Sequence, residues 1–97
     1  DDMIIKNGVN IYPVEIEKHL LLMAEIEEVL VTKEKHPVKG EIIIAFVKFF
    51  SGVSVSVEEI NTRLRQVMAS IKVPDRFEIV AEFGYTPTGK RIKPVLN

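Results

Sequence analysis

Residues 1–23 contain two different spacings of apolar positions. Short apolar stretches on either side of Asn7-Gly8 predict a two-stranded hairpin, because an Asn-Gly pair tolerates the positive φ angles of a tight turn. Pro13 suits the first turn of a helix, and apolar residues then recur three or four positions apart, at Ile16, Leu20 and Met23. The pattern therefore predicts a hairpin followed by an amphipathic helix.

The middle of the chain is richer in β-branched residues. Residues 26–35 predict a strand, and Pro37 and Gly40 predict the turn that follows it. Residues 41–50 carry apolar or aromatic side chains at nearly every position, which is typical of a central strand covered on both faces. We expect this segment to form the core of the domain.

The second half of the chain predicts one more helix and one more strand. Ser56 and Glu59 have the spacing of a capping box, in which each side chain satisfies a free backbone N–H group at the start of a helix. Apolar residues at helical spacing extend this helix as far as Ile71: Val57, Ile60, Leu64, Val67, Met68 and Ile71. Residues 76–83 predict a short strand, and residues 84–91 are too rich in turn-forming residues for regular structure. The predicted fold is α+β, with an N-terminal two-stranded hairpin and then a small three-stranded sheet with helices packed on it.

Composition limits the range of functions. The 97 residues form a single domain, and 46% apolar with 28% charged residues can fill a modest core. Thirteen Lys and Arg residues against 14 Asp and Glu residues give a net charge of −1, which disfavours a dedicated nucleic-acid or anionic-membrane surface. The absence of cysteine excludes a disulfide scaffold and a thiolate zinc site, and no apolar run is long enough to span a membrane. His19 and His36 lack metal-ligand spacing, so we expect no metal site. Because the first residue is not methionine, we expect a segment of a longer protein.

A cationic loop near the C-terminus is the clearest candidate for chemistry. Residues 84–90 read Gly-x-x-x-x-Gly-Lys after a predicted strand, but Arg91 replaces the Ser or Thr of a P-loop and Pro94 disfavours its helix. Lys90 on such a loop can deliver one positive charge to an anionic site, and the alternative is a solvated basic loop. The acidic residues in mid-chain are expected to form a solvated helix end without an acid–base role: Glu25, Glu27 and Glu28.

Two motifs resemble those of the adenylate-forming enzymes, which include acyl-CoA synthetases, peptide-synthetase adenylation domains and luciferases. Residues 1–17, Asp-Asp-Met-Ile-Ile-Lys-Asn-Gly-Val-Asn-Ile-Tyr-Pro-Val-Glu-Ile-Glu, resemble their hinge-and-glycine motif, most closely that of fatty-acyl and related acyl- or aryl-CoA synthetases. Residues 86–90, Thr-Pro-Thr-Gly-Lys, resemble their C-terminal lysine motif. The resemblance implies that residues 1–97 are the C-terminal domain of a two-domain cytoplasmic ligase. Residues 1–12 would form its hinge and glycine-loop hairpin, and residues 84–93 its catalytic lysine loop.

The resemblance also implies a reaction in two steps. In this family a carboxylic acid and Mg-ATP form an acyl-adenylate and pyrophosphate; the small domain then turns, and CoA attacks to give a thioester and AMP. ATP, Mg²⁺ and the acid would be bound mainly by a large N-terminal domain, with CoA as co-substrate, and the isolated small domain would be inactive. By resemblance, Lys90 is the catalytic cation, Thr86 and Gly89 belong to its motif loop, Gly8 lies beside CoA and Asp1 is the hinge.

The sequence departs from the family pattern at Ile5. Some relatives carry there a lysine that assists thioester formation, whereas Lys6 stands one place on and is expected to point to the opposite face. We therefore do not assign that role to Lys6. Glu15 and Glu17 match a Glu-Ile-Glu signature that we interpret as structural. Two alternatives stay open: an adenylation domain that loads a carrier protein, and a free-standing α+β interaction or regulatory domain whose basic tail binds an anionic partner.

Overall fold

The computed structural model describes residues 3–94 and has an α+β fold. The helices and strands follow in the order β1 (Ile4–Lys6), β2 (Val9–Ile11), α1 (Pro13–Leu21), β3 (Ile26–His36), β4 (Gly40–Phe49), α2 (Val57–Arg65), the 3₁₀ helix η1 (Ser70–Lys72), β5 (Arg76–Ile79), β6 (Gly84–Tyr85) and β7 (Arg91–Ile92). The predicted fold class is confirmed.

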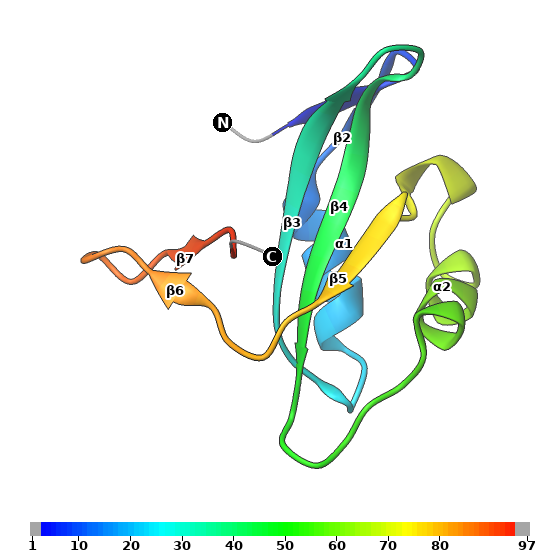
Figure 1. Ribbon diagram of the computed structural model, residues 1–97. Coiled ribbons are helices and arrows are strands. Elements are labelled where there is room, and N and C mark those ends of the chain that lie inside the picture. The colour runs from blue at the N-terminus through cyan, green and yellow to red at the C-terminus, as the bar shows by residue number, and fades with distance from the viewer. Residues whose placement is uncertain (1–2, 95–97) are drawn as a thin grey trace.

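Strand β4 lies at the centre of the sheet (Figure 1). One of its edges pairs with the antiparallel strand β3 over the whole length of β3, as far as the pair His36↔Gly40. Its other edge is shared, because β1 joins at the single pair Lys6↔Gly40 and β5 runs parallel to it from the pair Ile44↔Arg76 onward. The predicted three-stranded sheet is therefore β3-β4-β5, and the β1–β2 hairpin extends it to five strands.

The sheet is covered on both faces, as predicted for its central strand. Both helices pack on the face that carries Ile43, Ala45 and Val47, and together they form the main core, whose helical members are Ile16, Leu20, Ile60 and Leu64. On the opposite face, Ile44 and Phe46 contact Val80 and Phe83, which follow β5. The C-terminal segment thus crosses the face that the helices leave open.

The helix predicted from Ser56 is shorter than its apolar stripe suggested. Half of the predicted capping box is present: Ser56 Oγ accepts a hydrogen bond from the Glu59 N–H at 3.0 Å, whereas the Glu59 carboxylate accepts one from Arg63 Nε at 2.9 Å. However, α2 ends at Arg65, and Val67 is 59% exposed instead of packing on the sheet. The chain must turn back here to place β5 alongside β4, and η1 makes that turn, so the tertiary path overrides the local periodicity.

Neither helix is long enough to cross a membrane, and no other described residue belongs to a helix that could.

Candidate active site

The predicted lysine loop is a hairpin with an ordered turn. Gly84 and Tyr85 of β6 pair with Ile92 and Arg91 of β7, so the prediction of irregular structure for residues 84–91 is wrong. The reason is the turn's own hydrogen bonding, which centres on Thr86. Its N–H donates to the Lys90 carbonyl at 2.8 Å, its carbonyl accepts from the Gly89 N–H at 2.9 Å, and its Oγ1 accepts from the Lys90 N–H at 3.0 Å.

Backbone conformation explains the glycine in this turn. Gly89 has φ +91, a conformation that side chains with a Cβ rarely adopt, and nothing lies within 4 Å of where its Cβ would be. Thr86 and Gly89 therefore fix the backbone from which the Lys90 side chain extends.

Lys90 offers an unpaired ammonium group at the end of this turn. The residue is exposed, and its side chain makes no hydrogen bond or ion pair within residues 3–94. The neighbouring cations are engaged: Arg91 Nη1 lies 3.8 Å from Glu28 Oε2, and Lys93 Nζ lies 3.8 Å from Glu34 Oε2. Of the three cations on this segment, Lys90 is the one free to meet an anion from outside the domain.

The glycine of the N-terminal motif also occupies a tight turn. Asn7 has φ 49 and Gly8 has φ 77, as the predicted Asn-Gly hairpin requires. Gly8 is exposed, and nothing lies within 4 Å of where its Cβ would be. Backbone conformation, and not crowding inside the domain, sets the requirement for glycine.

This hairpin is fixed to the domain by a buried ion pair that the sequence did not reveal. Lys6 is only 6% exposed, and its Nζ donates to both carboxylate oxygens of Asp75, at 2.8 and 3.0 Å. Lys6 ends β1 and Asp75 precedes β5, so the pair joins two strands that share one edge of β4. Their 69-residue separation leaves no local signal of the contact.

Asp75 is held in its charged form. Although the residue as a whole is exposed, its side chain is only 17% exposed. Burial by itself raises the pKa of Asp75, but the hydrogen bond from the Ile43 N–H and the Lys6 ammonium outweigh it, so the pKa lies below its ordinary value. The carboxylate therefore serves both as counter-ion and as backbone acceptor for β4.

The two faces of β1 differ as expected. Ile5 is 48% exposed, whereas Lys6 points into the domain, which confirms that Lys6 does not share the face of Ile5. The Ile5 N–H donates to Glu41 Oε1 at 2.8 Å, and this bond, with the charge of Lys33, lowers the pKa of Glu41 despite partial burial.

The Glu-Ile-Glu signature makes structural contacts, as interpreted from the sequence. Glu17 Oε2 accepts a hydrogen bond at 2.9 Å from the N–H of Val31, on the edge of β3 that no strand of the described residues covers. Glu15 pairs with Lys72 Nζ at 3.1 Å. Both carboxylates thus hold α1 against neighbouring elements.

The mid-chain acidic residues do not form a solvated helix end. Glu25 precedes β3, whereas Glu27 and Glu28 lie within it, and each has a side-chain partner on another element. Glu25 binds Arg63 in α2 at 2.8 Å, Glu27 pairs with Lys48 of β4, and Glu28 accepts a hydrogen bond from the Tyr85 hydroxyl in β6. The acidic run joins three separate elements to β3, which a single sequence does not show.

In Figure 1 the lysine hairpin projects from beside the middle of β3, whereas the glycine hairpin lies near the end of β3 that leads into the β3–β4 turn. The lysine hairpin contacts Glu28 near the start of the strand, and the glycine hairpin lies beside the β3–β4 turn, where the Asn7 N–H donates to the Lys39 carbonyl. An extended strand rises about 3.3 Å per residue, so Glu28 and His36 lie roughly 26 Å apart. Asp1, the predicted hinge, lies outside the described residues.

The described residues contain no group of three His, Cys, Asp or Glu side chains that could hold a metal ion. His36 has a structural contact instead, because its Nδ1 accepts hydrogen bonds from the N–H groups of Val38 and Lys39 in the β3–β4 turn.

Comparison with known proteins supports the resemblance seen in the motifs. Residues 15–90 match the family described as the AMP-binding enzyme C-terminal domain. The chain belongs to this family. The match runs from the Glu-Ile-Glu signature through Lys90, so it includes β3, β4, β5 and the lysine turn but not the glycine hairpin.

The individual relatives of this chain are ligases and synthetases, and each comparison is with the chain itself. It is 35% identical over 92 residues, 95% of the chain, to a long-chain-fatty-acid–CoA ligase of Bacillus subtilis. It is 34% identical over 97 residues to a 3,4-dihydroxybenzoate–[aryl-carrier protein] ligase of Bacillus anthracis. Among solved structures, a Mycobacterium tuberculosis fatty acyl CoA synthetase matches 94% of the chain with a TM-score of 0.85 and 32% identity.

These relatives are much longer than this chain. The chain spans 16% of the Bacillus subtilis ligase, 23% of the Bacillus anthracis ligase and 18% of the Mycobacterium tuberculosis synthetase.

Proposed function

We propose that this chain is the small C-terminal domain of a two-domain ligase that activates a carboxylic acid with ATP and transfers the acyl group to CoA. The observation that carries the proposal is Lys90, an unpaired cation at the end of a turn that Thr86 holds in place. Membership of the AMP-binding enzyme C-terminal domain family supports it, as do the acyl-CoA ligases among its relatives.

Lys90 would act in the first step. A carboxylate oxygen of the acid attacks the α-phosphorus of ATP, and the bond to pyrophosphate breaks to leave an acyl-adenylate. This step brings two anions together, and a preorganised cation that bridges the carboxylate and α-phosphate oxygens lowers its barrier. We assign ATP, its Mg²⁺ and the acid mainly to the large domain, so the isolated chain should be inactive.

Gly8 would act in the second step. The thiol sulfur of CoA attacks the acyl carbon, the bond to AMP breaks, and a thioester forms. A glycine on an exposed turn lets the thiol arm pass close to the backbone, where a side chain would obstruct it. Because Lys90 and Gly8 lie on separate hairpins that contact different parts of the domain, we expect the domain to turn between the steps, and Asp1 stays our predicted hinge for that motion.

Lys90→Ala in the intact ligase tests the first assignment. We expect carboxylate-dependent pyrophosphate exchange to fall by orders of magnitude, whereas thioester formation from supplied acyl-adenylate is spared. Lys18→Ala is the matched control, since Lys18 is an exposed lysine of α1 without an ion pair in the described chain. An equal loss in both half-reactions would contradict the role of Lys90.

Gly8→Leu tests the second assignment and should have the reverse effect. It should slow CoA transfer from supplied acyl-adenylate and spare pyrophosphate exchange. Gly52→Leu controls for backbone strain, because Gly52 has φ 80 and equally open surroundings but lies in the loop before α2. If the two variants transfer CoA equally well, Gly8 does not border the thiol path.

A carrier protein is the second candidate acceptor, favoured by the aryl-carrier protein ligase among the relatives. Supplying the intact ligase with acyl-adenylate and either CoA or a phosphopantetheinyl carrier protein separates the two. Faster acylation of CoA supports the proposal, and exclusive acylation of the carrier protein replaces it with the alternative.

A further inference from the structure

The lysine hairpin is attached to the outer face of β3 by polar contacts. The Tyr85 hydroxyl donates to Glu28 Oε2, and Arg91 Nη1 lies 3.8 Å from the same oxygen. Farther along β3, Lys93 Nζ lies 3.8 Å from Glu34 Oε2. Two glutamates on one face of a single strand therefore receive one contact from β6, one from β7 and one from the segment after β7.

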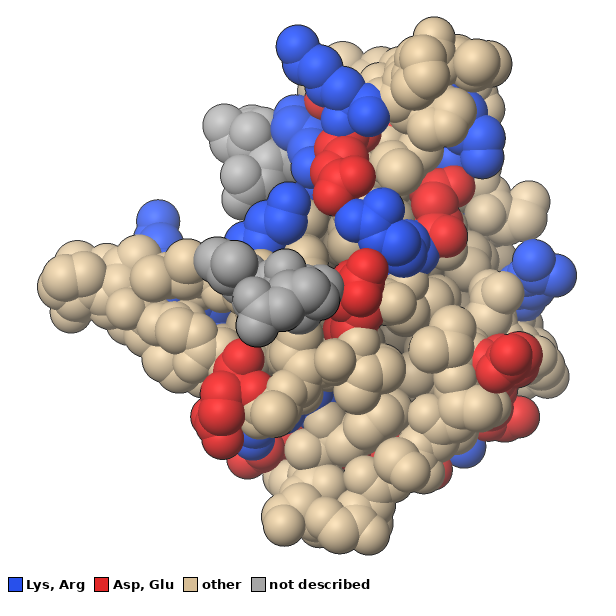
Figure 2. All heavy atoms as spheres, in the orientation of Figure 1, with Lys and Arg blue, Asp and Glu red and all other residues tan. Residues whose placement is uncertain are grey.

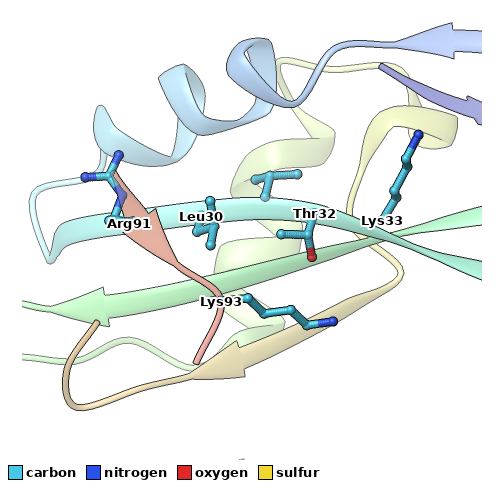
Figure 3. Close-up of a pocket in the computed structure, with 6 residues that line it drawn as sticks. Leu30, Thr32, Lys33, Arg91 and Lys93 are labelled. Carbon is cyan, nitrogen blue, oxygen red and sulfur yellow. The ribbon is translucent and has the colours of Figure 1, made fainter. Parts of the chain in front are cut away.

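The strands of the hairpin add little apolar packing to this attachment, although Phe83 directly before β6 is buried against Ile44 and Phe46. All four residues of β6 and β7 are exposed, with Tyr85 at 49% and Ile92 at 46%. Between the hairpin and β3 lies a hollow of about 320 Å³, lined by Leu30, Val31, Thr32, Lys33, Arg91 and Lys93 (Figure 3). The Thr32 hydroxyl is buried and has no hydrogen-bond partner among the described residues. Beyond the buried Phe83 at its base, the hairpin is held over this hollow by its polar contacts.

The charges around the second contact keep Glu34 ionised. Arg76 Nη2 lies 2.8 Å from Glu34 Oε2, and this hydrogen bond lowers the pKa of Glu34. Lys93 Nζ also lies 5.9 Å from the centroid of the Phe46 ring, within cation–π range. Acidic and basic side chains alternate across this face of the molecule (Figure 2).

We propose that Glu28 and Glu34 are positioning residues for Lys90, forming a two-point latch that sets where the lysine hairpin sits on the domain. The proposal rests on the role of Lys90 given above. Neither glutamate touches substrate; each acts through the hairpin. Transition-state stabilisation by a cation depends on its placement to within a fraction of an ångström, so a released hairpin should slow adenylation. Acceptor transfer, which we assign to the other hairpin, should not change.

Glu28→Gln and Glu27→Gln form a matched pair of variants for the intact ligase. Glu27 stands next to Glu28 but pairs with Lys48 of β4, so its loss should leave the hairpin attached. We expect Glu28→Gln to lower kcat for pyrophosphate exchange roughly tenfold. Its KM for ATP and its thioester formation from supplied acyl-adenylate should stay within about twofold. Glu27→Gln should stay within about twofold throughout. Equal effects of the two variants would overturn the latch.

Exchanging the charges of Glu28 and Arg91 tests whether the ion pair between them holds the hairpin. The double variant Glu28→Arg/Arg91→Glu places the opposite charges at the same two positions. It should regain part of the kcat that Glu28→Arg alone loses. No recovery would remove the Arg91 pair from the latch and leave Tyr85 as the contact through which Glu28 acts. If Tyr85→Phe then also leaves kcat within about twofold, Glu28 does not act through the hairpin and the proposal is overturned.

Spin labels on the 97-residue chain read the hairpin position without any catalysis. The chain has no cysteine, so Lys90→Cys and Lys18→Cys can be labelled uniquely, and their distance distribution reports the hairpin against α1. Glu28→Gln should broaden this distribution and Glu27→Gln should not. An unchanged distribution overturns the latch. If Lys90→Ala leaves pyrophosphate exchange intact, the proposed function fails, while the label experiment still decides whether the latch exists.

Discussion

The two hairpins of this domain turn differently, around two residues in one and five in the other, and they are held in opposite ways. Each turn contains a glycine at positive φ, Gly8 in one and Gly89 in the other. The first hairpin is part of the core, since Ile4 and Ile11 are fully buried. Lys6 is also paired with Asp75 at the edge of β4 that β1 and β5 share. The second is exposed and rests on side-chain contacts to β3.

This difference has an energetic meaning. A buried ion pair contributes little net stability compared with apolar residues, but removing one partner leaves an uncompensated charge and is costly. Exposed pairs are individually weak and are screened by salt. The glycine hairpin should therefore move as one body with the sheet, whereas the lysine hairpin can be displaced without unfolding the domain.

Removing the carboxylate of Asp75 should have the largest effect on stability. Asp75→Ala leaves the Lys6 ammonium buried without a counter-ion and the Ile43 N–H without its acceptor. We expect the free energy of unfolding to fall by about 3 kcal/mol, measured by urea titration.

The double variant Lys6→Met/Asp75→Asn is its control. It removes both charges and keeps an acceptor for Ile43, so it should recover much of the loss. If Asp75→Ala lowers the free energy of unfolding by no more than the loss of an exposed ion pair does, the Lys6–Asp75 pair does not hold the hairpin as a buried ion pair.

Alanine at the two turn glycines compares the hairpins directly. Both positions have positive φ and open surroundings, so the local strain of adding a Cβ is the same. Gly8→Ala should lower global stability by about 1 kcal/mol, because its hairpin belongs to the core. Gly89→Ala should leave global stability nearly unchanged, because the lysine hairpin can open locally. Equal losses in urea titrations would show that both hairpins unfold with the sheet.

Local signals predicted the parts of the fold that local physics determines. The Asn7-Gly8 turn, the helix that begins at Pro13 and the Ser56 cap all follow from neighbouring residues, and the structure confirms them. The length of α2 could not be predicted, because the need to bring Arg76 beside Ile44 ends it early. The apolar spacing from Val67 onward carries no sign of that long-range demand.

The residues of the candidate site also fall into those that the sequence predicted and those that it did not. The family motifs singled out Lys90 and Gly8 because their chemistry resides in residue type and short spacing. Their supports were missed, since Asp75 lies far from Lys6 in sequence and Glu28 lies far from Tyr85. Glutamates at positions 28 and 34, on one face of a predicted strand, were the available signal for the second support.

Acidification should weaken the Lys6–Asp75 ion pair that holds the first hairpin. The pKa of folded Asp75 lies below its ordinary value of 3.8, so its contribution to stability is complete above the unfolded pKa and is lost as the pH falls through the folded pKa. Other carboxylates with lowered pKa values, such as Glu25 and Glu41, contribute in the same range. The test is therefore the difference between the wild-type chain and Asp75→Asn. The free energy of unfolding should fall less steeply below about pH 4 in the variant, and parallel curves would show that Asp75 gains no stabilisation from its charge.

Ionic strength should affect the two hairpins differently, and this is the smallest of the expected effects. Raising the ionic strength from about 0.1 M to about 1 M shortens the Debye length from about 10 Å to about 3 Å, which screens the exposed pairs of Arg91 and Lys93 but hardly reaches the buried Lys6 pair. The distance distribution between labels at Lys90→Cys and Lys18→Cys should therefore broaden with salt. Labels at Asn10→Cys, on the exposed face of β2, and Lys18→Cys should give a distribution that stays constant. Broadening of both distributions would mean that the glycine hairpin is also held by screened charges, and constancy of both would mean that packing alone fixes the lysine hairpin.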